Sequence, residues 1–261
     1  MLPTLAGQLP LTEPMDQEQI ERIDAASLDI LEEVGVVFRD DIALEDWRKA
    51  GADVRGERVH LDRGLVKSLI KTIPSEITLH ARNPEKTVAL GGRQSIFIPM
   101  TGAPYLRDLE DVRRSPTLDD LATFHKLAHM LPAMHSSAHH IVEPMDHPIS
   151  HRHLRITHSS MLYSDKTFMG MTTSGQNAED VLDMCAILFG EEYLETHAVV
   201  TGNCNGNSPL VWDETMLSAM RAFNRRNQPV LCSPFVLGGA NTPASTVPTV
   251  AQLNAEALSA L

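Results

Sequence analysis

The chain has 261 residues, and 34 acidic against 22 basic side chains give it a formal charge of −12 with histidine neutral. Apolar residues make up 43% and charged residues 21%, as in folded globular proteins, which excludes a disordered or collagen-like polypeptide. The acidic balance argues against nucleic acid as a partner, because it repels a phosphate backbone. Apolar runs stay far short of the roughly 18 residues that a spanning helix needs, so no membrane segment is expected.

The N-terminus and the cysteines predict a cytoplasmic protein. Residues 1–16 contain no basic segment followed by an apolar one, so no secretory signal is expected. The three cysteines, Cys185, Cys204 and Cys232, form no CxxC pair. An odd number without such a pair suits a reducing compartment better than a disulfide framework.

The first 92 residues predict a small α+β subdomain. Asp16 and Gln19 have the spacing of a capping box at the start of a helix, and Gly35 supplies its stop. The elements expected after it are a helix over 42–50 that ends at Gly51, a hairpin over 52–61, a helix that starts at Asp62, and strands over 76–81 and 87–90.

From residue 93 onward, apolar strand-like runs alternate with helix-like segments. The runs cover residues 96–100, 133–142, 167–173, 198–203 and 230–237, and the helices are expected to start near Thr117, Asn177, Asp213 and Pro248. The runs recur about every 31–37 residues, which is the length of one βα unit. They are apolar on both faces, as buried parallel strands are. Right-handed crossovers would make this an α/β fold.

About five βα units are too few for a closed barrel, because eight units need about 250 residues by themselves. We therefore predict an incomplete (β/α)8 TIM-type barrel over residues 93–261, truncated at the C-terminus, after the α+β subdomain of residues 1–92. The alternative is an open, five-stranded doubly wound sheet of the flavodoxin type. Unpaired edges after the first and fifth strands would promote self-association, so a homo-oligomer is one expected state.

In either α/β architecture, ligands bind at the carboxyl ends of the strands. Those ends carry glycine and neutral hydrogen-bonding residues over 101–105, 136–140, 172–175, 201–207 and 233–243. They lack the clustered Asp, Glu and Lys of most acid–base or Schiff-base barrels. No catalytic acid, base or nucleophile is therefore assigned.

These segments resemble the trimethylamine methyltransferase family. The resemblance begins with Leu-Glu-Glu-Val-Gly-Val over 31–36 and continues through Phe-Ile-Pro over 97–99 with Thr101 and Gly102. It extends through Gly202 and Asn203 with Asn-Ser-Pro-Leu over 207–210, and through Pro234 with Gly-Gly-Ala over 238–240. Family members look like (β/α)8 barrels of nearly twice this length. The resemblance thus implies the N-terminal unit and about five of eight repeats, without the later region that holds pyrrolysine in the founding members.

The resemblance implies transfer of a methyl group from a quaternary or tertiary methylamine, such as glycine betaine or trimethylamine, to the Co(I) corrinoid of a partner protein. The partners implied are the small amine and a cognate corrinoid protein, and no cofactor is expected to bind this chain tightly. Since the corrinoid supplies the nucleophile, the protein has to hold the methyl group in line with cobalt and exclude water.

Two kinds of substrate contact are predicted at the strand ends. Aromatic faces normally hold a quaternary ammonium, and Tyr105 and Phe235 are the rings at these ends. A betaine carboxylate would need hydrogen-bond donors. The predicted donors are the side chains of His139, Asn203, Asn205 and Asn241 and the backbone amides of Gly238 and Gly239.

Seven histidines between residues 135 and 158 raise the alternative of a metal-dependent TIM-barrel hydrolase. Such barrels place an HxH pair on the first strand, where this chain has Phe-Ile-Pro over 97–99. No metal site is therefore predicted. A further alternative is that the chain is an inactive, truncated fragment of the methyltransferase.

Overall fold

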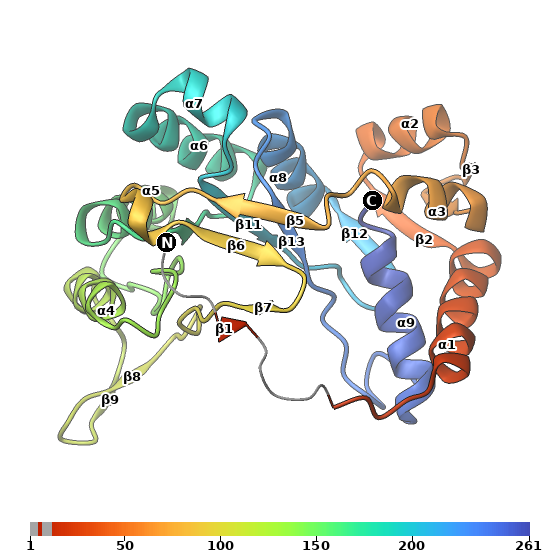
Figure 1. The fold of residues 1–261 in the computed structure, drawn as a ribbon, viewed down its shortest axis with the longest axis horizontal. Coiled ribbons are helices and arrows are strands. Elements are labelled where there is room, and N and C mark those ends of the chain that lie inside the picture. The colour runs from red at the N-terminus through yellow and green to blue at the C-terminus, as the bar shows by residue number, and fades with distance from the viewer. Residues whose placement is uncertain (1–4, 7–11) are drawn as a thin grey trace. The chain divides into compact units, whose positions relative to one another are not determined.

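The computed structural model describes residues 5–6 and 12–261. They form two compact units, each built from separate stretches of the chain (Figure 1). The first unit combines Ser75–Asn203 and Ala219–Val230 with β1 (Leu5–Ala6). The second combines the stretch that ends at Pro74 with Cys204–Ser218 and Leu231–Leu261. The domain boundary expected after residue 92 stays a prediction.

A four-stranded sheet of order β12-β2-β4-β3 lies at the centre of the second unit. The strands β2 (Val36–Arg39), β4 (Arg58–His60) and β3 (Asp53–Arg55) pair antiparallel. The strand β12 (Val211–Asp213) comes from much later in the chain and pairs parallel with β2, which sets Trp212 opposite Phe38. Both rings are buried, so this late strand completes the core of the N-terminal elements.

Each helix predicted in the second unit is present, although the last one begins at Thr246, two residues before Pro248, and ends at Leu258. The helix α1 (Gln17–Asp29) starts with the Asp16–Gln19 capping box and continues through a short π-helix, Ile30–Val34, to Gly35. A Cβ on Gly35 would lie 2.6 Å from the Val59 carbonyl oxygen, and its φ is +72°, so glycine is required there. The other helices are α2 (Asp41–Ala50), α3 (Arg63–Ile70), which Asp62 caps as expected, and α9 (Thr246–Leu258).

The helix α9 packs against α1 and is also tied to the loop after β11 (Val200–Cys204). The Glu256 carboxyl group, almost fully buried, accepts hydrogen bonds from the Ser208 hydroxyl group, the Leu210 amide at 3.1 Å and the Gln252 side chain at 2.8 Å. Trp212 Nε1 donates to Ser259 Oγ at 2.9 Å. The Asn-Ser-Pro-Leu segment over 207–210 therefore serves to anchor α9.

The first unit begins with antiparallel pairs. The strand β5 (Glu76–Leu79) pairs with β6 (Val88–Gly91) across a short 3-10 helix, Pro84–Lys86, and β7 (Gln94–Ser95) pairs with β1. A small hairpin follows, in which β8 (Leu106–Arg107) pairs with β9 (Arg113–Arg114). The two strands expected over 76–81 and 87–90 are confirmed as this antiparallel pair.

The five runs predicted as parallel strands lie beside one another in chain order. His135 N donates to Phe97 O at 2.8 Å, and parallel bridges join Ala103 to Val142 and Ser136 to Thr167. The strand β10 (Phe168–Met169) pairs parallel with β11, and β11 is followed by β13 (Val230–Cys232) in the sheet order β10-β11-β13. The pairings recorded for residues 5–6 and 12–261 form a mixed α/β structure and no closed barrel.

Two of these runs form no regular strand, which corrects the prediction for residues 96–100 and 133–142. The second contains isolated bridges at Ser136 and Val142, and the first has its bridge just beyond it, at Ala103. Pro99 has no amide to donate, and the Phe97 amide donates to the His135 ring at Nδ1 (2.9 Å) instead of to a backbone carbonyl. The ladder between the first two segments is therefore interrupted.

The helices of the first unit are α4 (Leu118–Met130), α5 (Ile149–Tyr163), α6 (Gly175–Phe189) and α7 (Glu191–Thr196), and α8 (Glu214–Arg225) begins in the second unit. Thr117 caps α4 with Asp120, as predicted. The start of α6 lies earlier than predicted, because Ser174 Oγ accepts from Asn177 N and makes Asn177 the third helical residue. Among the described residues, no helix is long and apolar enough to cross a membrane.

Candidate functional site

The ends of the first two parallel segments meet in the first unit. Gly102 N donates to His140 O at 2.8 Å, and Glu143 N donates to Ala103 O at 2.9 Å. A Cβ on Gly102 would lie 3.5 Å from His140 Nε2, and the φ of Gly102 is +81°. The positive φ therefore favours glycine in the Thr101–Gly102 turn, which lies beside His140.

His139 and His140 form a hydrogen-bonded pair through their Nδ1 atoms. His139 is 4% exposed, and burial, followed by the nearby imidazoles of His140, His125 and His153, holds its pKa well below the usual value. Burial also lowers the pKa of His140, although Glu143 opposes the shift. Both rings are therefore neutral near pH 7, and each carries one proton.

The surrounding groups favour one arrangement of these two protons. Glu143 Oε1 accepts from Arg152 Nη1 at 2.8 Å, while Glu143 Oε2 lies 3.6 Å from His140 Nε2. The carboxylate favours a proton on the nitrogen that faces it, so His140 Nδ1 accepts and His139 Nδ1 donates. His139 Nε2 is then a bare lone pair, and this atom is buried without a hydrogen-bond partner.

A second imidazole is held in the same way. His153, on α5, contacts Asp180 Oδ2 on α6 through Nε2 at 2.7 Å, and this hydrogen bond lowers the pKa of Asp180. His153 Nδ1 is buried and has no partner. His125 is instead satisfied on both sides, by the His139 carbonyl at 2.8 Å and by Ser159 Oγ at 3.0 Å. The site thus contains two buried ring nitrogens, His139 Nε2 and His153 Nδ1, that have no hydrogen-bond partner.

Sequence reasoning missed Glu143, Arg152, His153 and Asp180 as parts of this site. The crowding of histidines was the available signal, but the spacing of His153 and Asp180 along the chain does not show that α5 and α6 bring them together. Among the described residues, no three His, Cys, Asp or Glu side chains are arranged to hold a metal ion.

Tyr105 follows the Thr101–Gly102 turn and is 50% exposed. Its ring already faces a cation, because the Arg113 guanidinium carbon lies 3.9 Å from the ring centroid. Asn203, the remaining predicted residue of the first unit, is half-buried on β11, where its carbonyl accepts from Thr172 Oγ1 at 2.6 Å. The turn that carries Tyr105 and the His139–His140 pair are thus brought to the same end of the parallel segments.

The remaining predicted residues belong to the second unit. Asn205 Oδ1 accepts from Ser233 Oγ at 2.6 Å, and the Phe235 ring is largely exposed. Asn241 accepts from the Leu237 amide at 2.6 Å and donates to the Phe235 carbonyl at 2.8 Å. Its side chain therefore holds the loop that carries Phe235.

The two glycines of this loop differ in their backbone roles. Gly239 has a φ of +81°, and its amide donates to the Thr242 carbonyl at 3.0 Å and the Pro243 carbonyl at 3.3 Å within its own turn. Gly238 bridges to Thr242. The Gly-Gly-Ala segment thus forms a tight turn ahead of α9.

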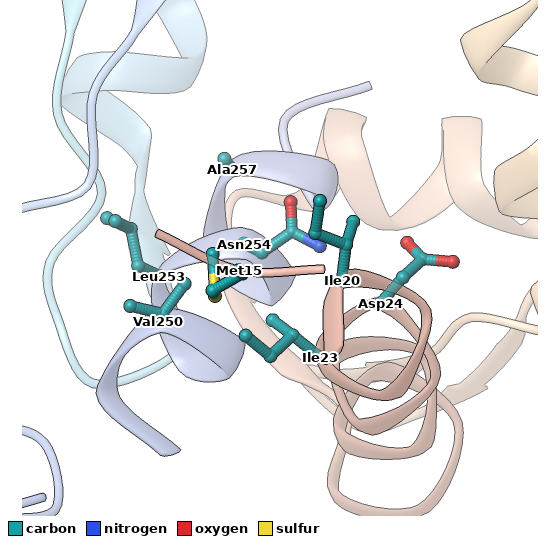
Figure 2. A pocket seen from close by; sticks show the side chains of 8 residues that line it. All are labelled: Met15, Ile20, Ile23, Asp24, Val250, Leu253, Asn254 and Ala257. Atoms are coloured by element: carbon teal, nitrogen blue, oxygen red, sulfur yellow. The ribbon is translucent and has the colours of Figure 1, made fainter. Parts of the chain in front are cut away.

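A separate pocket of about 460 Å³ lies between α1 and α9 of the second unit (Figure 2). Its lining is apolar apart from Asp24 and Asn254, and Figure 2 shows Ile20 and Ile23 of α1 on one side and Val250 and Leu253 of α9 on the other. Among the described residues that line this pocket, none is aromatic or cationic, so they do not supply the groups that a betaine needs at either end.

Parallel segments that follow one another in chain order and end in glycine and polar residues are typical of α/β proteins that bind small molecules at the strand ends. A family model described as trimethylamine methyltransferase (MTTB) matches residues 1–261, so the chain belongs to this family. The resemblance stated from the sequence is confirmed.

Three curated relatives carry names that specify a methyl donor. The chain is 40% identical, over 98% of its length, to the glycine betaine methyltransferase of Desulfitobacterium hafniense (strain Y51), and covers 54% of that protein. It is 25% identical to the trimethylamine methyltransferase MttB of D. hafniense (strain DSM 10664 / DCB-2), over 94% of this chain and 50% of that one. It is 26% identical to the proline betaine:corrinoid methyltransferase of Eubacterium limosum, over 93% and 51%. The chain spans about half the length of these relatives.

Proposed function

We propose that this chain belongs to a methyltransferase that moves a methyl group from a betaine-type quaternary amine to the Co(I) corrinoid of a partner protein. The observation that carries the proposal is the 40% identity to a glycine betaine methyltransferase over 98% of the chain. The identities to the trimethylamine and proline betaine enzymes are 25% and 26%. A quaternary betaine is therefore favoured over a tertiary amine as the substrate, and methyl transfer over the metal-dependent hydrolase.

The proposed architecture is a (β/α)8 barrel of which this chain supplies about five units. The order of the hydrogen-bonded segments supports it, because 97–103, 135–142, 167–169, 200–204 and 230–232 are consecutive both in sequence and in space. That order is also the one in which a barrel is wound. The length of the relatives, about twice that of this chain, leaves room for the remaining units.

The reaction requires the protein to position the methyl group and to exclude water. The corrinoid supplies the nucleophile that takes the methyl group, and the C–N bond breaks with its electron pair left on nitrogen. The departing amine is neutral, so no general acid is required. The neutral ring of His139 suits such a site, because a protonated ring would repel a quaternary ammonium.

We assign the ammonium group to the face of Tyr105 in the first unit, with the bare nitrogen of His139 directed to the positive end of the substrate. The side chain of Asn203 is the proposed carboxylate donor of that unit. In the second unit, Phe235 is a second candidate aromatic face, and the Asn205 side chain and the Gly238 amide are candidate carboxylate donors.

Gly239 and Asn241 have a different proposed role. The Gly239 amide and the Asn241 side chain bond within the loop itself, so both hold the Phe235 loop in place.

The test is methyl transfer from glycine betaine to Co(I) cobalamin, followed by the absorbance of methylcobalamin. The polypeptide extended to the length of its relatives is expected to form methylcobalamin, and this chain alone is not. Glycine, which has no methyl group on nitrogen, serves as the matched control donor. Equal turnover by both polypeptides would contradict the expectation that this chain alone is inactive. Absence of transfer from any quaternary amine by the extended polypeptide would overturn the proposed function.

A further inference from the structure

The hairpin after Tyr105 places a cation on the ring of that residue. In the β8–β9 pairing, Leu106 lies opposite Arg114 and Arg107 lies opposite Arg113. The returning strand thus brings Arg113 back to the start of the hairpin, where its guanidinium carbon lies 3.9 Å from the Tyr105 ring centroid. Figure 1 shows the hairpin extending away from α4.

Arg113 differs from the other two arginines of this hairpin. Arg107 Nη1 pairs with Asp111 Oδ1 at 2.6 Å, and Arg114 pairs with both carboxylate oxygens of Asp120 at 2.6 and 2.7 Å. The recorded contact of Arg113 is the Tyr105 ring. The base of the hairpin is therefore fixed by Arg114, and Arg113 is free of that anchoring role.

We propose that Arg113 is an internal competitor for the cation-binding face of Tyr105, and that a methylated ammonium has to displace it from the ring. This inference rests on the proposed function, in which Tyr105 contacts the ammonium group. Guanidinium and quaternary ammonium are both weakly hydrated cations that bind a π face. Arg113 thereby shows that the ring accepts a cation, and its presence weakens the site for any other.

The contact is weak enough to be exchanged. Tyr105 is half exposed, Arg113 is exposed, and Leu109 at the hairpin tip is fully exposed, so little packing holds the guanidinium in place. Cation–π contacts at exposed sites correspond to about a two- to five-fold change in an equilibrium constant. Removal of Arg113 should therefore tighten cation binding by about that factor.

The experiment compares Arg113→Gln with Arg107→Gln in the full chain. Both substitutions remove one positive charge from the same hairpin, but only the first removes a contact with Tyr105. Tetramethylammonium is titrated into each variant, and the aromatic NMR signals of the Tyr105 ring report binding. We expect a dissociation constant about two- to five-fold lower for Arg113→Gln than for the unchanged chain, and no such gain for Arg107→Gln.

An unchanged dissociation constant in Arg113→Gln would overturn the inference, as would an equal gain in both variants, which would indicate a general charge effect. Arg113→Gln is also made in a Tyr105→Leu background, where binding is followed by the proton signal of tetramethylammonium itself, and no gain is expected there. If tetramethylammonium binds without perturbing Tyr105, or does not bind, the inference also fails. These readouts need no methyl transfer, so they are separate from a failure of the proposed reaction.

Discussion

Replacing Glu256 with alanine is expected to destabilise the second unit by about 2–4 kcal/mol. The carboxyl group is 2% exposed and accepts hydrogen bonds from Ser208, the Leu210 amide and Gln252. A buried donor left without a partner costs about 1–3 kcal/mol. The Leu210 amide is fixed in the backbone and bears that cost in full, whereas the Ser208 and Gln252 side chains can turn to other partners.

Urea unfolding followed by tryptophan fluorescence measures this loss. The chain has two tryptophans, Trp47 and Trp212, and both lie in the second unit, so the signal reports that unit. Glu256→Gln keeps one acceptor oxygen and should fall between the alanine variant and the unchanged chain. Glu33→Ala, on an exposed position, should change the free energy of unfolding by less than about 0.5 kcal/mol. Equal losses in the Glu256 and Glu33 alanine variants would refute the anchoring role.

Three further predictions concern the first unit. Burial lowers the pKa values of His139 and His140 in the folded chain. Below about pH 6.5 the unfolded chain therefore binds more protons than the folded chain does. The free energy of unfolding, measured by urea titration, should fall as the pH is lowered from about 7 to 5.5. Lys166→Met should cost about 2–4 kcal/mol in thermal unfolding, because the buried ammonium donates to three backbone carbonyls at and beyond the end of α4. Gly170→Ala should cost about 1–3 kcal/mol, since its Cβ would lie 2.8 Å from a ring carbon of Phe223.

Each of these predictions has a control or a contrary outcome. Asp180 has a pKa lowered from 3.8, so it titrates below the pH range assigned to His139 and His140. A free energy of unfolding that does not change between about pH 7 and 5.5 would contradict the burial of these two histidines as neutral rings. Lys67→Met, at an exposed position of α3, should leave the unfolding midpoint nearly unchanged. An unaltered midpoint in Gly170→Ala would show that the aromatic ring gives way to the methyl group.

Helix starts were predictable from the sequence because a cap depends on residues three or four apart. The capping boxes at Asp16 and Thr117 and the cap at Asp62 are all confirmed. Pairing between distant segments was not predictable in the same way. The parallel pairing of Val211–Asp213 with β2 joins two apolar stretches that lie far apart in the chain. Nothing in the sequence of either stretch indicates that the other is its partner.

The candidate site shows the same division between local and distant signals. Glycine and polar residues at the strand ends led us to expect a site there, because parallel strands end at one edge of a sheet. The proton arrangement of His139 depends on Glu143 and Arg152, and the contact of Tyr105 with Arg113 depends on a hairpin register. Side-chain partners set by folded geometry leave no pattern in the sequence.

Whether a methylated cation binds beside Tyr105 is tested most directly by intermolecular nuclear Overhauser effects from the methyl protons of glycine betaine. We predict contacts from these protons to the ring protons of Tyr105. Contacts to Ile20 and Leu253 in the α1–α9 pocket, with none to Tyr105, would contradict it.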